Sequence, residues 1–359
     1  MLRSLKIENF RCFKAFELQQ LGRLNLFVGT NNSGKTSILE AVQLLNSQAA
    51  FDSLREVMLS RGEYILNDER SGSRELDVRH LFYGHEIDIG SNFSIISNTN
   101  IDKEKQEGIT VSIEHTGQLS LFENLRELAL AVEWRLDQNS ESIKLPLSLE
   151  EGLPIGYLRR IRRDFDISKA KTQFVTSSSL TTEEMINLFN KVVLTDEEDF
   201  VIEALQTIEP KIERIAPGEL RTRNPGLRDG FRVRLSNSEQ PIPIGSMGDG
   251  IWRLLALTLS IVNARNGFLL VDEVDTGLHF SVMSDMWKLV WTAAKRLNVQ
   301  VFATTHSNDC WTSLAAIANA ENPSEEGITI QRIEKDKPHS VVFTERQIVI
   351  AAERGIEVR

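Results

Sequence analysis

The sequence predicts an α/β fold with a mostly parallel core sheet, and both ends of the chain carry the signal. Near the N-terminus, the apolar run 24–28 is followed by a glycine-containing loop and then by helical spacing of apolar residues over 37–45. The C-terminal third alternates between helical and strand-like segments, at 251–262, 268–271, 282–297 and 299–303. Strands that alternate with helices are typical of a parallel sheet covered on both faces.

The first eighteen residues and the middle of the chain predict further elements. Apolar residues alternate on both sides of the turn at 11–13, which predicts an N-terminal antiparallel sheet. Candidate strands in the middle span 86–95, 109–114 and 128–136. Helices are predicted over 183–192 and 197–208, because Thr181 with Glu184 and Thr195 with Glu198 form capping-box pairs. The tail over 328–343 is typical of a two-stranded edge, followed by a short final helix.

These elements suggest how the chain is divided. We expect a single domain over residues 1–359, assembled from both ends of the chain. Within it, residues 86–175 are expected to form a mainly β insertion, and residues 176–250 a helical lobe that leads to the segment around Ser246. The sequence contains no sustained heptads, so a long coiled-coil arm is not expected.

Composition narrows the class of protein. The longest apolar stretch, 254–262, is too short to span a bilayer, and the N-terminus lacks the pattern of a signal peptide, so membrane insertion is not expected. Cys12 and Cys310 are far apart and have no CxxC partner, which favours a reducing, cytoplasmic location. The net charge of −10 argues against a protein that coats nucleic acid over its whole surface.

The loop after the first apolar run matches the P-loop pattern GxxxxGK[ST] in full. Its glycines let backbone N–H groups curl around an anion, and the helix that follows directs its positive end at the phosphates. Lys35 is expected to reach the β- and γ-phosphates of ATP, and the Thr36 hydroxyl to bind Mg²⁺. The residues predicted to bind the nucleotide here are Gly29, Asn31, Asn32, Ser33, Gly34, Lys35, Thr36 and Ser37.

Two later strands are predicted to bring catalytic groups to the same edge of the sheet. The run 268–271 ends in Asp272 and Glu273, of which Asp272 can hold Mg²⁺ through water and Glu273 can polarise the attacking water. The next strand ends in Thr-His-Ser, which places His306 where it could sense the γ-phosphate as a hydrogen-bond donor. Glu273, His306 and Lys35 are therefore the predicted catalytic residues.

Together with the segment from Glu8 to Phe13, these motifs resemble the ATPase heads of the SMC/RecF/OLD-like branch of the ABC superfamily. Residues 275–279 are similar to the D-loop of OLD-like AAA-type ATPases, and residues 246–253 stand where that superfamily has its signature motif. The resemblance implies an ABC-ATPase-like P-loop fold, with Arg11 at the nucleotide. It also implies that the signature segment contacts the γ-phosphate bound to a second subunit, through Ser246, Gly248 and Gly250.

The chain departs from this family pattern at several places. Its signature segment does not read LSGGQ, and Phe280 stands where the OLD-like pattern usually has proline. Gln173 is the candidate for the Q-loop glutamine. Only about fifty residues follow His306, fewer than the Toprim nuclease domain of OLD nucleases needs, so we expect the nuclease half to be absent.

The resemblance implies an ATP-driven homodimer in which two copies enclose two ATP molecules. Binding would close the dimer and hydrolysis would release it. We expect the ATPase subunit of a bacterial defence or DNA-maintenance system that regulates a separate nuclease or other effector. The alternatives are a RecF-like repair ATPase that binds DNA directly, a non-hydrolysing ATP-binding scaffold, and a transporter subunit. A GTPase is disfavoured because the sequence contains no NKxD motif.

Two arginine groups leave direct DNA binding open. They could contact phosphate backbones, or they could be solvated and paired with nearby acids. The first group is Arg159, Arg160, Arg162 and Arg163, and the second is Arg221, Arg223, Arg228, Arg232 and Arg234.

Overall fold

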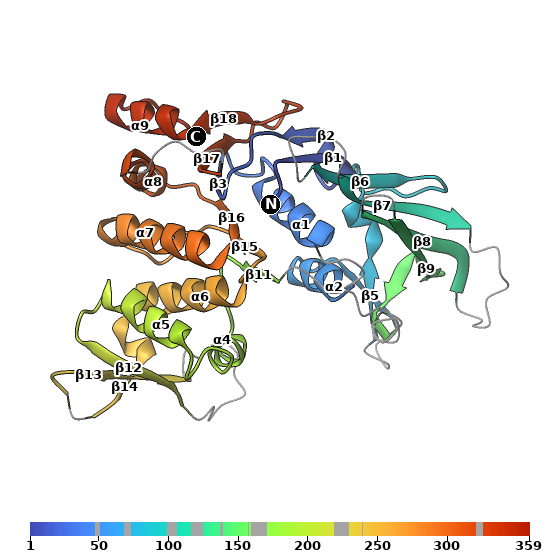
Figure 1. Cartoon of the computed structure of the whole chain (residues 1–359). Coiled ribbons are helices and arrows are strands. Elements are labelled where there is room, and N and C mark those ends of the chain that lie inside the picture. The colour runs from blue at the N-terminus through green and yellow to red at the C-terminus, as the bar shows by residue number, and fades with distance from the viewer. Residues whose placement is uncertain are drawn as a thin grey trace. The chain divides into compact units, whose positions relative to one another are not determined.

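The computed structural model describes residues 1–46, 51–67, 73–98, 106–115, 125–136, 139–156, 158, 171–218, 230–238, 240–320 and 326–359. The chain divides into two compact units, and Figure 1 shows their elements. The first unit comprises Met1–Leu21, Asn32–Ala170 and Ile333–Ser340, and the second comprises Gly22–Asn31, Lys171–Arg332 and Val341–Arg359. Each unit therefore combines segments that are far apart in the sequence.

The first unit is built on a six-stranded antiparallel sheet in the order β2-β1-β6-β7-β8-β9. Its strands are β1 (Ser4–Phe10), β2 (Phe13–Leu18), β6 (Asn92–Asn98), β7 (Gln106–His115), β8 (Leu125–Leu136) and β9 (Asn139–Ser148). Helix α1 (Lys35–Asn46) packs against β6 and β7 and is buried along almost its whole length. The predicted N-terminal antiparallel sheet is confirmed.

A second, three-stranded sheet completes the first unit. Its order is β10-β5-β4, and its elements are β4 (Tyr64–Asn67), β5 (Ser73–Asp77) and β10 (Gly152–Pro154), with α2 (Phe51–Ser60) and the 3₁₀ turn η1 (Val78–Leu81) beside it. The strand predicted over 86–95 is wrong at its start, because β6 begins only at Asn92. His85 and Gly90 both have positive φ, so the chain turns there instead of running extended.

The second unit is built on a mostly parallel sheet in the order β11-β15-β16-β3-β17-β18, which confirms the predicted fold class. The first five strands run parallel, and β18 pairs antiparallel with β17. The strands are β11 (Thr172–Val175), β15 (Phe268–Val271), β16 (Gln300–Thr304), β3 (Leu24–Val28), β17 (Ile328–Arg332) and β18 (Val341–Thr344). The predicted two-stranded edge over 328–343 is confirmed: β17 and β18 pair antiparallel and are the last two strands at one side of this sheet.

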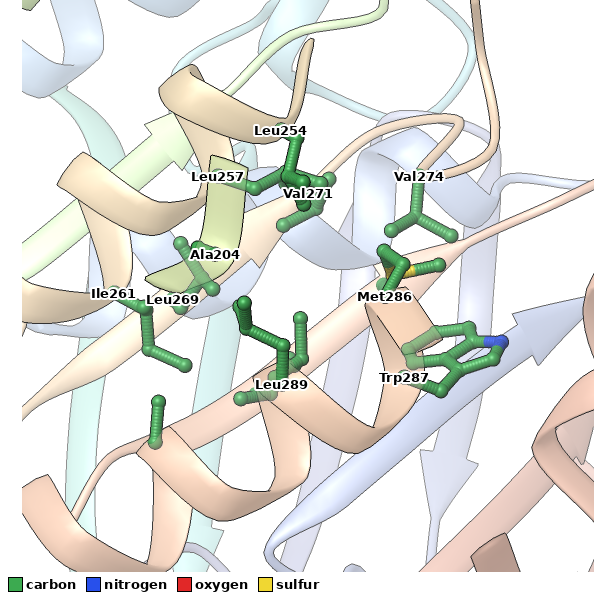
Figure 2. Close-up of a cluster of buried hydrophobic side chains, with 14 of the residues drawn as sticks. Ala204, Leu254, Leu257, Ile261, Leu269, Val271, Val274, Met286, Trp287 and Leu289 are labelled. Atoms are coloured by element: carbon green, nitrogen blue, oxygen red, sulfur yellow. The ribbon is translucent and has the colours of Figure 1, made fainter. Parts of the chain in front are cut away.

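Helices α6 (Asp249–Asn263) and α7 (Phe280–Leu297) form the core of this unit with the sheet. Figure 2 shows Leu254 and Leu257 of α6 beside Val271 of β15, and Met286 of α7 near Val274. Helices α8 (Asn308–Ala320) and α9 (Glu345–Arg354) complete the unit, and α8 is not predicted by the sequence patterns. Within the residues that the structure describes, no helix combines the length and apolarity needed to cross a bilayer.

The segment between β11 and α6 contains α4 (Thr182–Phe189) and α5 (Asp196–Gln206), followed by a small sheet that the sequence patterns do not predict. This sheet has the order β12-β13-β14, with β12 (Ile212–Pro217), β13 (Phe231–Leu235) and β14 (Ile242–Pro243), and leads into the 3₁₀ turn η2 (Ile244–Met247). The boundaries predicted for a β insertion over 86–175 and a helical lobe over 176–250 stay a prediction.

The two predicted capping boxes differ in outcome. At the start of α4, Thr181 and Glu184 form the complete capping box. At α5 the prediction is wrong, because Thr195 makes no side-chain cap bond. Its hydroxyl donates instead to the Val192 carbonyl at 2.6 Å, and the Glu198 carboxylate accepts from the Leu194 N–H at 2.7 Å.

Candidate nucleotide-binding site

Three motif-bearing strands end side by side at the carboxyl edge of the parallel sheet. Val271 of β15 pairs with Ala303 of β16, and Thr304 pairs with Phe27 of β3. Gly29, the first P-loop residue, follows β3 by one position, and Asp272 follows β15 directly. The His306 segment follows β16 in the same way, so the sheet brings the starts of all three motifs to one edge.

The P-loop backbone adopts conformations that its glycines permit. Gly34 has φ +97°, and a Cβ there would lie 2.3 Å from Phe13 Cζ and 2.8 Å from Cys12 Sγ. Only glycine fits this close approach. The loop passes from the second unit to the first between Asn31 and Asn32, and Lys35 begins α1 in the first unit.

Two features of the loop fit a phosphate ligand. The first turn of α1, Lys35 to Ile38, contains no acidic residue, so the positive end of the helix dipole is not neutralised locally. Among the described residues, the Ser33 hydroxyl oxygen is one of the buried polar atoms without a hydrogen-bond partner. A buried hydroxyl of this kind is free to bond a ligand oxygen.

The acidic pair after β15 is held in place by the end of β16. The Thr304 hydroxyl donates to Asp272 Oδ1 at 2.7 Å, and the Glu273 N–H donates to Thr304 Oγ1 at 2.8 Å. Glu273 has φ +47°, an unusual conformation for a residue other than glycine that occurs preferentially at functional sites. The Thr276 hydroxyl donates to Glu273 Oε2 at 3.3 Å, which orients the half-buried carboxylate.

The histidine segment is tied to the loop after the acidic pair. The Thr305 hydroxyl donates to Asp275 Oδ1 at 2.6 Å, and the Ser307 N–H donates to Thr305 Oγ1 at 3.0 Å. His306 itself is exposed. The sequence motifs predict no hydrogen-bonding role for Thr304, Thr305 or Asp275. Only the pairing of β15 with β16 would have indicated that these side chains meet.

The signature-like segment lies at the start of α6. Gly248 has φ +93° and precedes the first residue of the helix, and a Cβ there would meet open space. Ser246 is exposed, and its hydroxyl donates to the Pro243 carbonyl at 2.7 Å. Gly250 lies close to the D-loop-like segment: a Cβ added at this position would be 3.3 Å from the Gly277 carbonyl oxygen. The structure therefore brings these two segments into contact.

Arg11 is engaged in ion pairs within the first unit. Its Nε lies 3.1 Å from Glu40 Oε2, its Nη1 lies 2.5 Å from Glu63 Oε1, and Nη1 also donates to the His80 carbonyl at 3.1 Å. A role for Arg11 at the nucleotide stays a prediction.

The candidate Q-loop glutamine and two of the candidate DNA-binding arginines lie on strands of the second unit. Gln173 lies inside β11 beside Leu269, short of the strand's carboxyl end. Arg232 and Arg234 are exposed on β13. The remaining arginines of the two groups, Arg159, Arg160, Arg162, Arg163, Arg221, Arg223 and Arg228, lie outside the described residues.

The chemistry of the two predicted ligands suits a magnesium ion that is bound together with a nucleotide. Over the part of the chain that the structure describes, no cluster of three or more His, Cys, Asp or Glu side chains could hold a metal. Mg²⁺ is commonly held by one or two protein oxygens together with phosphate oxygens and water. Thr36, in the first unit, and Asp272, in the second, each carry an oxygen of this type.

Comparison with known proteins identifies the family. A family model described as an AAA ATPase domain matches residues 1–124 and 158–310. The chain belongs to the AAA ATPase domain family. It is 24% identical over 349 residues to an ATP/GTP phosphatase of Helicobacter pylori, and the match covers 86% of each protein.

Two further relatives connect this AAA ATPase domain to the OLD and RecF proteins. It is 22% identical over 328 residues to an OLD nuclease of Thermus scotoductus, a match that covers 86% of this chain and 59% of the nuclease. It is 53% identical over 47 residues to the DNA replication and repair protein RecF of Acinetobacter baylyi, which covers 13% of each. The resemblance inferred from the motifs is therefore confirmed.

Proposed function

We propose that this AAA ATPase domain binds ATP with Mg²⁺ and hydrolyses it at the carboxyl edge of the parallel sheet. The observation that carries the proposal is the shared strand end, where Thr304 of β16 holds both Asp272 and Glu273 one strand away from the start of the P-loop. The family and the ATP/GTP phosphatase relative support the same activity.

Each residue has a distinct task in this proposal. The P-loop backbone, Ser33 and Lys35 would bind the phosphates, and Thr36 and Asp272 would hold Mg²⁺. When bound, the ion would neutralise charge that develops on the transferred phosphoryl group. Glu273 would orient and polarise a water molecule for attack, and His306 would donate a hydrogen bond to the γ-phosphate.

Replacement of the P-loop lysine tests binding. Lys35→Ala should weaken ATP affinity by about 10- to 100-fold, because a charged hydrogen bond to phosphate contributes about 1.5–3 kcal/mol. Binding is measured with a fluorescent ATP analogue and hydrolysis by phosphate release. Lys288→Ala, which changes an exposed lysine of α7, is the matched control. Equal affinity of the wild-type protein and Lys35→Ala would contradict the proposal, and a wild-type turnover equal to that of Lys35→Ala would favour a non-hydrolysing scaffold.

We further propose that two copies close around two ATP molecules, with the signature-like segment of one copy at the nucleotide of the other. The exposure of Ser246 and the open space beside Gly248 support this arrangement. A Glu273→Gln variant with Mg·ATP should elute as a dimer on a sizing column. A variant that binds ATP and still elutes as a monomer would refute it for the isolated chain.

The partner in this proposal is a separate nuclease or effector of a bacterial defence or DNA-maintenance system. The OLD nuclease relative motivates it, since this chain aligns with only part of that protein. A pull-down from the native organism with the Glu273→Gln variant, with and without ATP, tests it. Recovery of the same proteins by Lys35→Ala would show that their capture does not depend on ATP.

A second candidate function, direct DNA binding, is favoured by the outer face of the small sheet. Arg214 pairs in register with Arg234, and Arg232 lies on the same face two residues earlier, while Phe231 and Val233 on the opposite face are buried. All three arginines are exposed, and Glu213 approaches Arg234 at 3.1 Å. Three guanidinium groups on one open face suit a phosphate backbone.

The charge of this face can be tested by neutralisation. If it binds DNA, replacing Arg214, Arg232 and Arg234 together by alanine should weaken duplex binding, and the slope of log K against log salt should fall by up to about 2.7. Fluorescence anisotropy over a salt series measures both effects. The control removes the same charge elsewhere, at the exposed Arg265, Arg346 and Arg354. An equal loss in both triple variants would contradict a dedicated site.

A further inference from the structure

Arg253, in the second turn of α6, is a buried arginine that binds backbone carbonyls. Only 2% of its surface is exposed. Nη1 donates to the Thr176 carbonyl at 2.6 Å, and Nη2 donates to the carbonyls of Asp272 and Glu273, each at 2.8 Å. Thr176 directly follows β11, and the two acids directly follow β15. One side chain therefore ties together the carboxyl ends of two neighbouring strands.

Holding a cation in this position is costly. Burial lowers the pKa of Arg253 to about 10, against the opposing influence of the charges on Asp275, Asp272 and Glu273. The guanidinium is still protonated near neutral pH, since that pKa lies well above 7. Its Nε is among the buried polar atoms of the described residues that have no hydrogen-bond partner. A buried charge with incomplete hydrogen bonding is a weak source of stability, which points to another use.

The contacts of Arg253 fix the backbone of Glu273 from one side. The Glu273 carbonyl accepts from Arg253 and from the Thr276 N–H at 3.0 Å, while its own N–H is bound by Thr304. Both backbone groups are thus held in the left-handed conformation at φ +47°. The direction of the Glu273 side chain follows from this conformation, because Cβ is fixed by the backbone.

Arg253 also connects Glu273 to the signature-like segment. It lies four residues after Asp249, the first residue of α6, so the two share one face of the helix. The first turn of α6 touches the D-loop-like segment through Gly250 and Gly277, and the second turn reaches Asp272 and Glu273 through Arg253. A displacement of the helix would therefore act directly on the backbone of the acidic pair.

We propose that Arg253 is a positioning residue that holds Glu273 in its hydrolytic orientation and transmits movement of the segment 246–250 to it. This inference rests on the proposed hydrolysis of ATP. Arg253 itself touches the strand ends, and it acts on the reaction only through Glu273.

The test is Arg253→Lys, which keeps the charge but cannot span the three carbonyls with one planar fork. The value of kcat should fall by about 10- to 100-fold, because small misplacements of a catalytic group have effects of this size, while ATP affinity stays within about twofold. Hydrogen exchange of the apoprotein should be faster in peptides that cover 268–278 and unchanged over 326–332. Arg265→Lys, at an exposed arginine that pairs with Glu197, is the matched control.

Each outcome decides the inference separately from the proposed function. If the wild-type protein hydrolyses ATP and Arg253→Lys retains both kcat and the exchange pattern, the role of Arg253 is refuted and the ATPase stands. If the wild-type protein shows no turnover, the proposed hydrolysis fails and with it the role of Arg253 in hydrolysis; faster exchange over 268–278 would then support only its hold on the backbone. Should the lysine variant not fold, Arg253→Met removes the buried charge, and a folded Met variant with unchanged kcat would overturn the inference.

Discussion

Glu273→Gln is expected to lower kcat for ATP by about 10²- to 10⁴-fold, the usual contribution of a positioned general base. The amide has nearly the same shape as the carboxylate, so it can still accept from the Thr276 hydroxyl and leave the backbone contacts of residue 273 intact. It cannot take a proton from water. ATP affinity should therefore stay within about threefold of the wild-type value, because only the transition state loses an interaction.

Single-turnover phosphate release and equilibrium binding of a fluorescent ATP analogue separate these two quantities. Glu353→Gln, which changes an exposed glutamate of α9, controls for the loss of one negative charge. If Glu273→Gln retained more than about half of the wild-type kcat, another group would have to activate the water, and the assignment of Glu273 would be wrong. A loss of ATP affinity equal to the loss of kcat would instead show that Glu273 acts in binding.

The parallel core could be predicted because its central strands are mostly apolar; only Asn25 in β3 and the end residues Gln300 and Thr304 of β16 are polar. All residues of β3, β15 and β16 are buried, and continuous apolar runs are what strands covered on both faces require. The P-loop and the acidic pair were found for a related reason: each is a short contiguous motif at the end of such a run. At these positions the apolar pattern of the strand and the chemically active residues are next to each other in the sequence.

The remainder of the candidate site depends on contacts between distant segments, which local patterns do not encode. Thr304 and Asp272 are 32 positions apart and meet only because β15 and β16 are neighbours. Arg253 stands in a mostly apolar helix, where its residue type alone would indicate a solvent-exposed position and not a buried contact to two strand ends. The small sheet of β12 to β14 is not predicted, because burial along β12 does not alternate and β14 has only two residues.

A buried charge cluster behind the P-loop helix leads to the second large expected effect. Glu40 of α1 is almost fully buried and contacts two arginines, Arg11 Nε at 3.1 Å and Arg61 Nε at 2.5 Å. Arg11 also binds Glu63, so two guanidinium groups and two carboxylates form one network. Burial raises the pKa of Glu40 above its ordinary value, and the charge of Arg11 is the largest influence that opposes this rise.

Arg11→Ala should lower the free energy of unfolding by about 3–5 kcal/mol, because it leaves the buried Glu40 carboxylate without one of its two compensating charges, the one that influences it most. Urea denaturation followed by circular dichroism measures the change. Arg79→Ala, at a half-exposed arginine of the same unit that pairs with Asp77, should cost less than about 1 kcal/mol. A loss for Arg11→Ala no larger than this control would show that the network contributes little. A reduced ATP affinity at unchanged stability would instead place Arg11 at the nucleotide.

If the buried Glu40 carboxylate causes the loss of stability in Arg11→Ala, that loss should depend on pH. A carboxyl group whose folded pKa lies above its unfolded value makes the protein less stable as pH rises from the unfolded pKa through the folded one. Removal of Arg11 raises the pKa of Glu40 further, so the destabilisation should be smaller at pH 5 than at pH 8. The double variant Arg11→Met with Glu40→Leu should lose this pH dependence and recover part of the stability, since it removes both charges. A destabilisation that is the same at both pH values would refute Glu40 as the cause.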